Sequence, residues 1–183
     1  MIENLKRLIL GNTRPWNGFW FWRDKQVGER GAAQKILQEA NFKVERLVSR
    51  ERDPPDCEAM LDGKWSGIEV TELVHKRTFQ QSITAVLQRA TGAVHFVWER
   101  DDLLEELRRI LKKKDKEPED PYQRYVLVIH TDEMYLDRER VDGFLQEATF
   151  NTNVITDAVL GLSYHPSCNG DGQYPVFRLN LAA

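Results

Sequence analysis

The sequence predicts a mixed α/β fold, in which a central sheet is flanked by helices. Residues 125–130 (YVLVIH) form a continuous apolar run, which is typical of a strand buried on both faces. The turn at Asp62-Gly63-Lys64 joins two strand-like segments, and Asp-Gly is a strong hairpin signal. Amphipathic helical patterns precede and follow these strands, so we expect helices that cover the sheet.

The composition limits the classes of protein to which this chain can belong. The chain has 183 residues, of which 41% are hydrophobic and 30% charged, which suits one folded domain. No apolar segment approaches the ~20 residues of a membrane span. Cys57 and Cys168 form no CxxC motif, so we expect reduced thiols and a cytoplasmic location. The net charge of −3 argues against a protein that coats nucleic acid, although an enzyme with a small basic groove remains open.

The first half of the chain begins with a helix over residues 28–40. Its apolar residues share one helical stripe: Ala33, Ile36, Leu37 and Ala40. A strand over residues 42–48 follows and is stopped by Pro54-Pro55, because proline cannot donate to a ladder. The hairpin strands then cover residues 57–61 and 65–73.

The second half adds helices and further strands. A long helix begins near Phe79, and a charged amphipathic helix lies within residues 99–120 on a leucine seam. After the strand at 125–130 we expect a helix over 138–148 and two late strands. These strands cover residues 158–164 and 175–181. We place the core at residues 28–130 and C-terminal additions at 134–183, all within one domain over residues 1–183.

Two acids on the hairpin are the main candidate site. Ile68 and Val70 suit the core, so Glu69 and Thr71 point to the opposite face. Asp56 stands across the hairpin from Glu69, and two such acids repel unless a cation lies between them. Mg²⁺ suits carboxylate oxygens, water and phosphate. A loop role for Asp56 is the alternative.

For the other acids near the hairpin, the position along the helix or strand indicates which way the side chain points. Glu29 lies in line with the apolar stripe of the first helix and could converge on the site as a third metal ligand. Its alternative role is to complement the helix dipole. We expect Glu58 and Glu72 to be out of phase with the acid pair and to point away from it.

The order helix, three strands, helix, strand resembles the PD-(D/E)XK nuclease superfamily, whose fold is that of the restriction endonucleases. The motif is present as Pro55-Asp56, twelve further residues, and Glu69-Val70-Thr71. The resemblance implies that Asp56 and Glu69, with Glu29, hold Mg²⁺ or Mn²⁺. It also implies that the metal promotes hydrolysis of a phosphodiester bond in nucleic acid, and we expect DNA.

Thr71 departs from the motif, because the superfamily has a lysine at this position. A hydroxyl cannot supply a positive charge. Three explanations remain: Lys76 or Lys64 supplies the charge, Thr71 holds a water without it, or the site is inactive. Gln80 and Gln81 stand where the superfamily often adds a polar residue, with helix capping as the alternative.

The competing function is a non-catalytic interaction module that keeps the nuclease-like fold. The missing lysine and the acidic balance favour it, whereas the retained acids disfavour it, because buried carboxylates are costly without a partner. A zinc site is poorly supported, because the four histidines have no HxH or HxxxH spacing, and there is no glycine-rich nucleotide loop. The aromatic segment at residues 16–22 suits a hydrophobic lid or a stacking surface.

Overall fold

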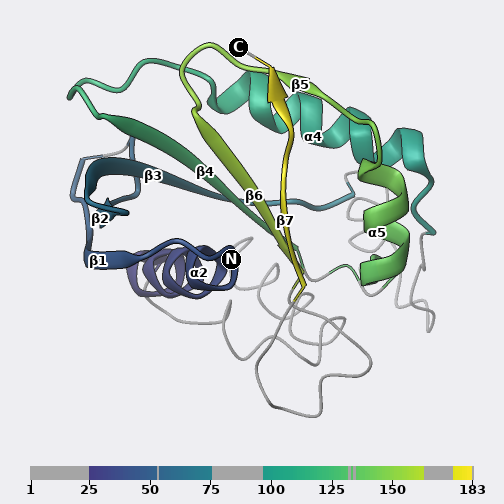
Figure 1. Cartoon of the computed structure of the whole chain (residues 1–183), viewed down its shortest axis with the longest axis horizontal. Coiled ribbons are helices and arrows are strands. Elements are labelled where there is room, and N and C mark those ends of the chain that lie inside the picture. The colour runs from purple at the N-terminus through teal and green to yellow at the C-terminus, as the bar shows by residue number, and fades with distance from the viewer. Residues whose placement is uncertain are drawn as a thin grey trace, which may run out of the picture.

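A computed structural model of the chain describes residues 25–52, 54–75, 97–131, 133, 135–162 and 175–182. The described helices are α2 (Lys25–Glu39), α4 (Arg100–Lys114) and α5 (Arg138–Leu145). The described strands are β1 (Val44–Ser49), β2 (Cys57–Leu61), β3 (Lys64–Glu72), β4 (Arg124–Thr131), β5 (Phe150–Asn151), β6 (Asp157–Leu162), β7 (Val176–Arg178) and β8 (Leu181–Ala182). Helices lie on both sides of the main sheet (Figure 1), which confirms the predicted mixed α/β class.

The main sheet has six strands in the order β1-β2-β3-β4-β6-β7. Strands β1, β2 and β3 form an antiparallel meander, whereas β3, β4 and β6 run parallel and β7 is antiparallel to β6. The expected C-terminal strands therefore extend the same sheet as the hairpin. The strand predicted over residues 175–181 is wrong in its extent, because the chain leaves β7 after Arg178 and then pairs β8 with β5.

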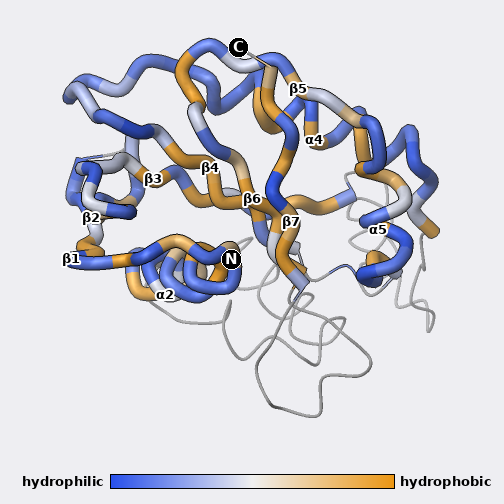
Figure 2. Tube along the Cα trace, in the orientation of Figure 1, coloured by the Kyte–Doolittle hydropathy of each residue, from blue (hydrophilic) through white to orange (hydrophobic). Residues whose placement is uncertain are grey.

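Alternation along the strands creates two separate cores. Ile68 and Val70 pack toward α2, together with Cys57 and Val128. On the other face, Leu127 and the other inward residues of β4 pack with α4 and α5. Figure 2 shows the apolar residues concentrated along β4 and β6, between these helices. Since neighbouring residues of a strand point to opposite faces, Glu69 lies on the α4 face.

The helix predicted within residues 99–120 is shorter in the structure than that range, and it ends at Lys114. Its buried residues are the predicted seam: Leu103, Leu104, Leu107, Ile110 and Leu111. At its start, the backbone N–H of Glu99 donates to the Asp102 carboxylate over 3.2 Å. At its end, the Asp115 N–H donates to the Leu111 carbonyl over 2.8 Å. The seam thus packs α4 on the sheet, and its last turn lies beside Glu69.

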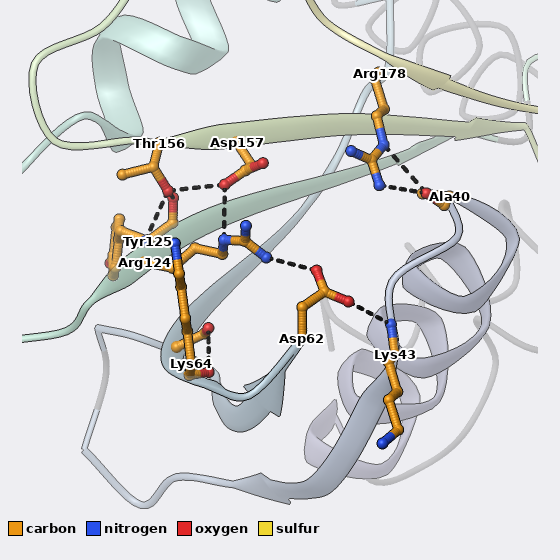
Figure 3. A network of polar contacts seen from close by, with 10 residues as sticks. Ala40, Lys43, Asp62, Lys64, Arg124, Tyr125, Thr156, Asp157 and Arg178 are labelled. Carbon is orange, nitrogen blue, oxygen red and sulfur yellow. Dashed lines mark hydrogen bonds and ion pairs between the residues drawn. The ribbon is translucent and has the colours of Figure 1, made fainter.

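Polar contacts tie the hairpin turn to the far strands of the sheet (Figure 3). Asp62 accepts from the Lys43 backbone over 2.9 Å and pairs with Arg124 at 2.9 Å. Arg124 also lies 3.2 Å from the Asp157 carboxylate. From β7, Arg178 donates to the Ala40 carbonyl at the end of α2. These contacts connect the hairpin turn with β4 and β6, and they connect β7 with the end of α2.

Some predictions fall on residues that the structure does not describe. The aromatic segment at 16–22, the helix beginning near Phe79, and the glutamines at 80 and 81 lie outside the described residues. The strand predicted over 42–48 begins at Val44 instead. Phe42 precedes it, and its backbone N–H donates instead to the Leu37 carbonyl of α2 over 2.9 Å. In the described part of the chain, no helix is long and apolar enough to span a bilayer.

We predict that Gly161→Ala lowers the free energy of unfolding by about 1–3 kcal/mol. A Cβ at this position of β6 would lie 2.7 Å from Cγ1 and Cδ1 of Ile36 on α2, so the helix or the strand must shift. The matched control is Gly143→Ala in α5, where a Cβ meets nothing within 4 Å. The control should be neutral or stabilising by up to ~1 kcal/mol. Urea denaturation of both variants tests this packing, and equal effects would contradict it.

Candidate functional site

Asp56 and Glu69 lie next to each other on neighbouring strands. Cys57 pairs with Ile68, so continuing the antiparallel register by one residue places Asp56 beside Glu69. Both carboxyl groups are buried, with 8% of Asp56 and 4% of Glu69 exposed. The Val70 backbone N–H donates to Oδ2 of Asp56 over 2.8 Å. The hairpin therefore brings together the two acids that the sequence singled out.

Lys114 supplies a positive charge to this pair. Its Nζ lies 2.7 Å from Oε2 of Glu69, and its side chain is 23% exposed. Lys114 is the last residue of α4, so it approaches from the helix layer that covers this face of the sheet. Thr71, which stands at the motif position of the lysine, cannot supply a positive charge. A lysine from a different element, α4, thus places one beside the acid pair.

Burial dominates the electrostatics of Glu69. Burial raises its pKa to about 7, and a hydrogen bond to Asp56 and the charge of Asp56 act in the same direction, whereas Lys114 opposes them. At neutral pH the protonated and the ionised forms of Glu69 are therefore both populated, even with the ammonium group beside it.

Tyr125 is the fourth group at the site. Its hydroxyl donates to Oε1 of Glu69 over 3.4 Å. Burial and the charge of Glu69 raise the pKa of Tyr125 above its ordinary value, so the hydroxyl stays a donor at neutral pH. Tyr125 belongs to β4, whose side chains alternate in the same way as those of β3. Both oxygens of the Glu69 carboxylate are therefore held, one by Lys114 and one by Tyr125.

A second polar cluster borders the acid pair on the same face. Tyr122 lies against Tyr125, with ring centroids 6.2 Å apart, and covers Gly67, where a Cβ would come within 3.0 Å of the ring. The Tyr122 hydroxyl donates to Glu58, and Arg50 donates to that hydroxyl. Arg50 also pairs with Asp120 at 2.7 Å. The two tyrosines thus lie beside the acid pair, and the cluster ties the loop before β4 to the hairpin.

The expected orientation of Glu58 is wrong. Residues 56 and 58 differ by two positions, so their side chains share one face of the strand, and Glu58 joins the cluster beside the acid pair. Burial raises the pKa of Tyr122, and its hydrogen bond to Glu58 raises it further. Glu58 is thus engaged by Tyr122 and Arg50 as part of this cluster.

The remaining candidates lie in different places. Thr71 follows Glu69 by two residues on β3 and is half-buried on the same face. Lys76 lies outside the described residues. Lys64 pairs with Leu61 at the hairpin tip, which is five residues, or about 16 Å of strand, from Glu69. Of the two lysines proposed from the sequence, Lys64 is therefore remote from the acid pair.

Glu29 belongs to α2, which packs on the opposite face of the sheet. Burial raises the pKa of the Cys57 thiol to about 12, and the charges of Asp56 and Glu29 act in the same direction. Glu29 thus lies near the start of β2. In the described residues, no three His, Cys, Asp or Glu side chains form a group that could hold a metal ion. The role of Glu29 as a third metal ligand stays a prediction.

The acid pair fits the chemistry of a divalent metal site. Mg²⁺ is bound in proteins through one or two carboxylates, with water and substrate phosphate completing its shell. Asp56 and Glu69 supply two carboxylates on one face, and burial and the charge of Asp56 raise the pKa of Glu69. A metal ion beside both groups would favour the ionised form of Glu69.

Lys114 and Tyr125 were missed by the sequence interpretation, although both carry a recognisable signal. Lys114 continues the buried seam of α4 at i+7 from Leu107 and i+3 from Leu111, which places it on the inward face. A run of lysines, which make up four of the five residues from 112 to 116, is nevertheless typical of a solvated surface. Tyr125 shares its face with Leu127 and Ile129. What no pattern supplied was the distance of either group from Glu69.

We predict that Lys114→Met destabilises the protein in a pH-dependent way. The folded-state pKa of Glu69 is raised, so its stability is fully present below the unfolded value of 4.5 and is lost as the pH rises through about 7. Without Lys114 this loss should deepen, to about 3 kcal/mol relative to wild type at pH 8.5 and about 1 kcal/mol at pH 5.

Lys113→Met is the matched control, because Lys113 is the exposed neighbour in the same helical turn. It should change the free energy of unfolding by less than ~0.5 kcal/mol at both pH values. Denaturant titrations of the two variants at each pH give the comparison. A Lys114→Met cost that is independent of pH would mean that the ion pair does not control the ionisation of Glu69.

Comparisons with protein-family models, with curated proteins and with solved structures found no match for this chain. The assignment of a function therefore depends on the residues of the site and on the order of the elements that carry them.

Proposed function

We propose that this protein is a metal-dependent nuclease, which hydrolyses phosphodiester bonds of nucleic acid and acts on DNA. The observation that carries the proposal is the cluster of two buried carboxyl groups and one ammonium group on a single face. Asp56 and Glu69 lie together, and Nζ of Lys114 is 2.7 Å from Glu69. Two acids and a lysine are the residue types that the PD-(D/E)XK resemblance implies, with the lysine supplied by α4.

The order of elements supports the same proposal. A helix, α2, precedes the antiparallel meander of β1, β2 and β3, and α4 then leads to β4, which pairs in parallel with β3. The acids stand on the hairpin of that meander, where the resemblance expects them. A fold by itself does not determine function, so the weight of the argument stays on the side chains.

Each group has a chemical role in this proposal. A metal held by Asp56 and Glu69 supplies Lewis acidity toward a phosphate oxygen and toward the attacking water. Lys114 places positive charge where negative charge develops on the phosphate, as the missing motif lysine would. Tyr125 orients the Glu69 carboxylate by its hydrogen bond. Thr71, on the same face, is placed to hold a water.

A polyanionic substrate has cations available beside the site. Lys112, Lys113 and Lys116 are exposed around the end of α4, next to Lys114. Lysines at such a place contact phosphates and fix the strand without reading its sequence. We also propose a cytoplasmic location, which is supported by Cys57, a buried free thiol.

One argument for a non-catalytic interaction module is the missing motif lysine. The ion pair of Lys114 with Glu69 weakens that argument, because it places a cation beside the acids. The exposed large apolar side chains among the described residues are Val48, Val97 and Tyr135, on three separate segments. The acidic balance of the chain stays as the argument for the module.

We predict that metal binding releases a proton. The pKa of Glu69 is raised to about 7, so below that pH a metal must displace the proton of Glu69. The Mn²⁺ affinity measured by calorimetry should rise about tenfold between pH 6 and pH 8 and then level off. Glu69→Gln should bind the metal weakly at every pH. An affinity that does not change with pH would argue against binding at the acid pair.

We predict metal-dependent cleavage of nucleic acid. The assay uses single-stranded, duplex and branched DNA together with RNA, each with Mg²⁺, Mn²⁺ or EDTA. Wild type should cleave DNA only with metal, and Asp56→Asn and Glu69→Gln should reduce cleavage to background. Lys114→Met should lower kcat by about 10²–10³-fold, and Lys114→Arg, which keeps the charge, should retain more activity.

Asp62→Asn is the matched control for these variants. It makes the same acid-to-amide change at the hairpin tip, at the opposite end of the β2–β3 pair from the acids. It should cleave like wild type, which excludes a contaminating nuclease and a general loss of folding. Folded wild-type protein that cleaves nothing on the panel and gains no thermal stability with metal would overturn the nuclease proposal.

A further inference from the structure

Asp115, the residue after Lys114, carries a heavily hydrogen-bonded carboxylate. It accepts from the backbone N–H groups of Asn153 and Val154, each over 2.8 Å, and of Ile155 over 3.0 Å. The Asn153 side chain adds a fourth contact of 3.1 Å. These contacts fasten the end of α4 to the segment that leads into β6.

The charge of Asp115 is unfavourable for the helix itself. The C-terminus of a helix carries partial negative charge, so an acid immediately after Lys114 opposes the helix dipole. Burial also opposes its ionisation, yet the four hydrogen bonds prevail and hold the pKa of Asp115 below its ordinary value. The residue is therefore suited to its contacts with the segment over 153–155 rather than to helix capping.

The same segment also holds the other neighbour of Glu69. The Thr156 backbone N–H donates to the Tyr125 carbonyl over 2.8 Å. In return, the Tyr125 backbone N–H donates to the Thr156 hydroxyl over 3.1 Å, a contact drawn in Figure 3 as part of the network around Arg124. One short segment thus contacts the backbone of Tyr125 and, through the Asp115 side chain, the residue next to Lys114.

We propose that Asp115 is a positioning residue that holds the end of α4 so that Lys114 reaches Glu69, with residues 152–156 as the common support for Lys114 and Tyr125. A lysine has four flexible side-chain bonds, so its contact with a carboxylate depends on where its Cα is fixed. The catalytic consequence of this positioning rests on the nuclease function proposed above. The positioning itself does not.

The first arm of the experiment measures Lys114 directly and needs neither metal nor substrate. Folded protein is treated briefly with an amine-acylating reagent, and the modification of each lysine is measured by mass spectrometry. Lys112 and Lys113 are exposed neighbours and serve as internal references. In wild type, the ion pair should slow the labelling of Lys114 about tenfold relative to them. In Asp115→Asn, the rate of Lys114 should rise toward that of its neighbours.

Two further variants complete this arm. Asp62→Asn is the control, because Asp62 also accepts a backbone N–H, from Lys43 over 2.9 Å, yet lies at the hairpin tip. It should leave the labelling ratio of Lys114 unchanged. Asn153→Ala removes only the 3.1 Å side-chain contact and should move the ratio in the same direction by less. This milder variant decides the question if Asp115→Asn does not fold.

The second arm is a double-mutant cycle on cleavage. Asp115→Asn should lower kcat about tenfold or more, and the double variant with Lys114→Met should be no slower than Lys114→Met alone. Additive losses would mean that Asp115 acts independently of Lys114, which overturns the proposal. So would an unchanged labelling ratio in Asp115→Asn and Asn153→Ala. Wild type that labels as expected but cleaves nothing would reject the nuclease function alone.

Discussion

The buried carboxylate of Glu69 is the constraint on which the arrangement of this face depends. A carboxylate with 4% exposure cannot remain charged without partners, because its transfer from water is costly. Three elements supply these partners. Asp56 directly precedes β2, Lys114 is the last residue of α4, and Tyr125 is the second residue of β4. The site therefore forms only when the hairpin, the helix and the parallel strand are packed together.

The surrounding contacts keep these elements in register. The Tyr122 ring covers Gly67, and Arg50 ties the loop before β4 to the hairpin. Asp115 and Thr156 hold the end of α4 and the start of β4 through one connecting segment. These contacts hold the partners of the Glu69 carboxylate in place. The charged groups and the packing contacts around them thus lie on the same face of the sheet.

The sequence predicted the hairpin, the seam of α4 and the central strand closely, because period-2 and helical patterns report directly on which side chains are buried. It also singled out Asp56 and Glu69, since local pairing across a short turn fixes their register. It misplaced Glu58 through an error of phase, and it did not single out Lys114, because a run of lysines usually marks an exposed tail. The split of β7 from β8 could not be predicted, because the partner of β8 is β5, about thirty residues earlier.

The amino-acid sequence by itself determined the α/β class, the acid-bearing hairpin and the inward face of each main element. These properties follow from local spacing, which acts over a few residues. Only the tertiary structure decided which cation meets Glu69, because residues 69 and 114 come together when α4 docks on the sheet. It likewise decided that burial would hold the pKa of Glu69 near 7. Desolvation and ion pairing depend on distances between elements, and a linear pattern does not encode those distances.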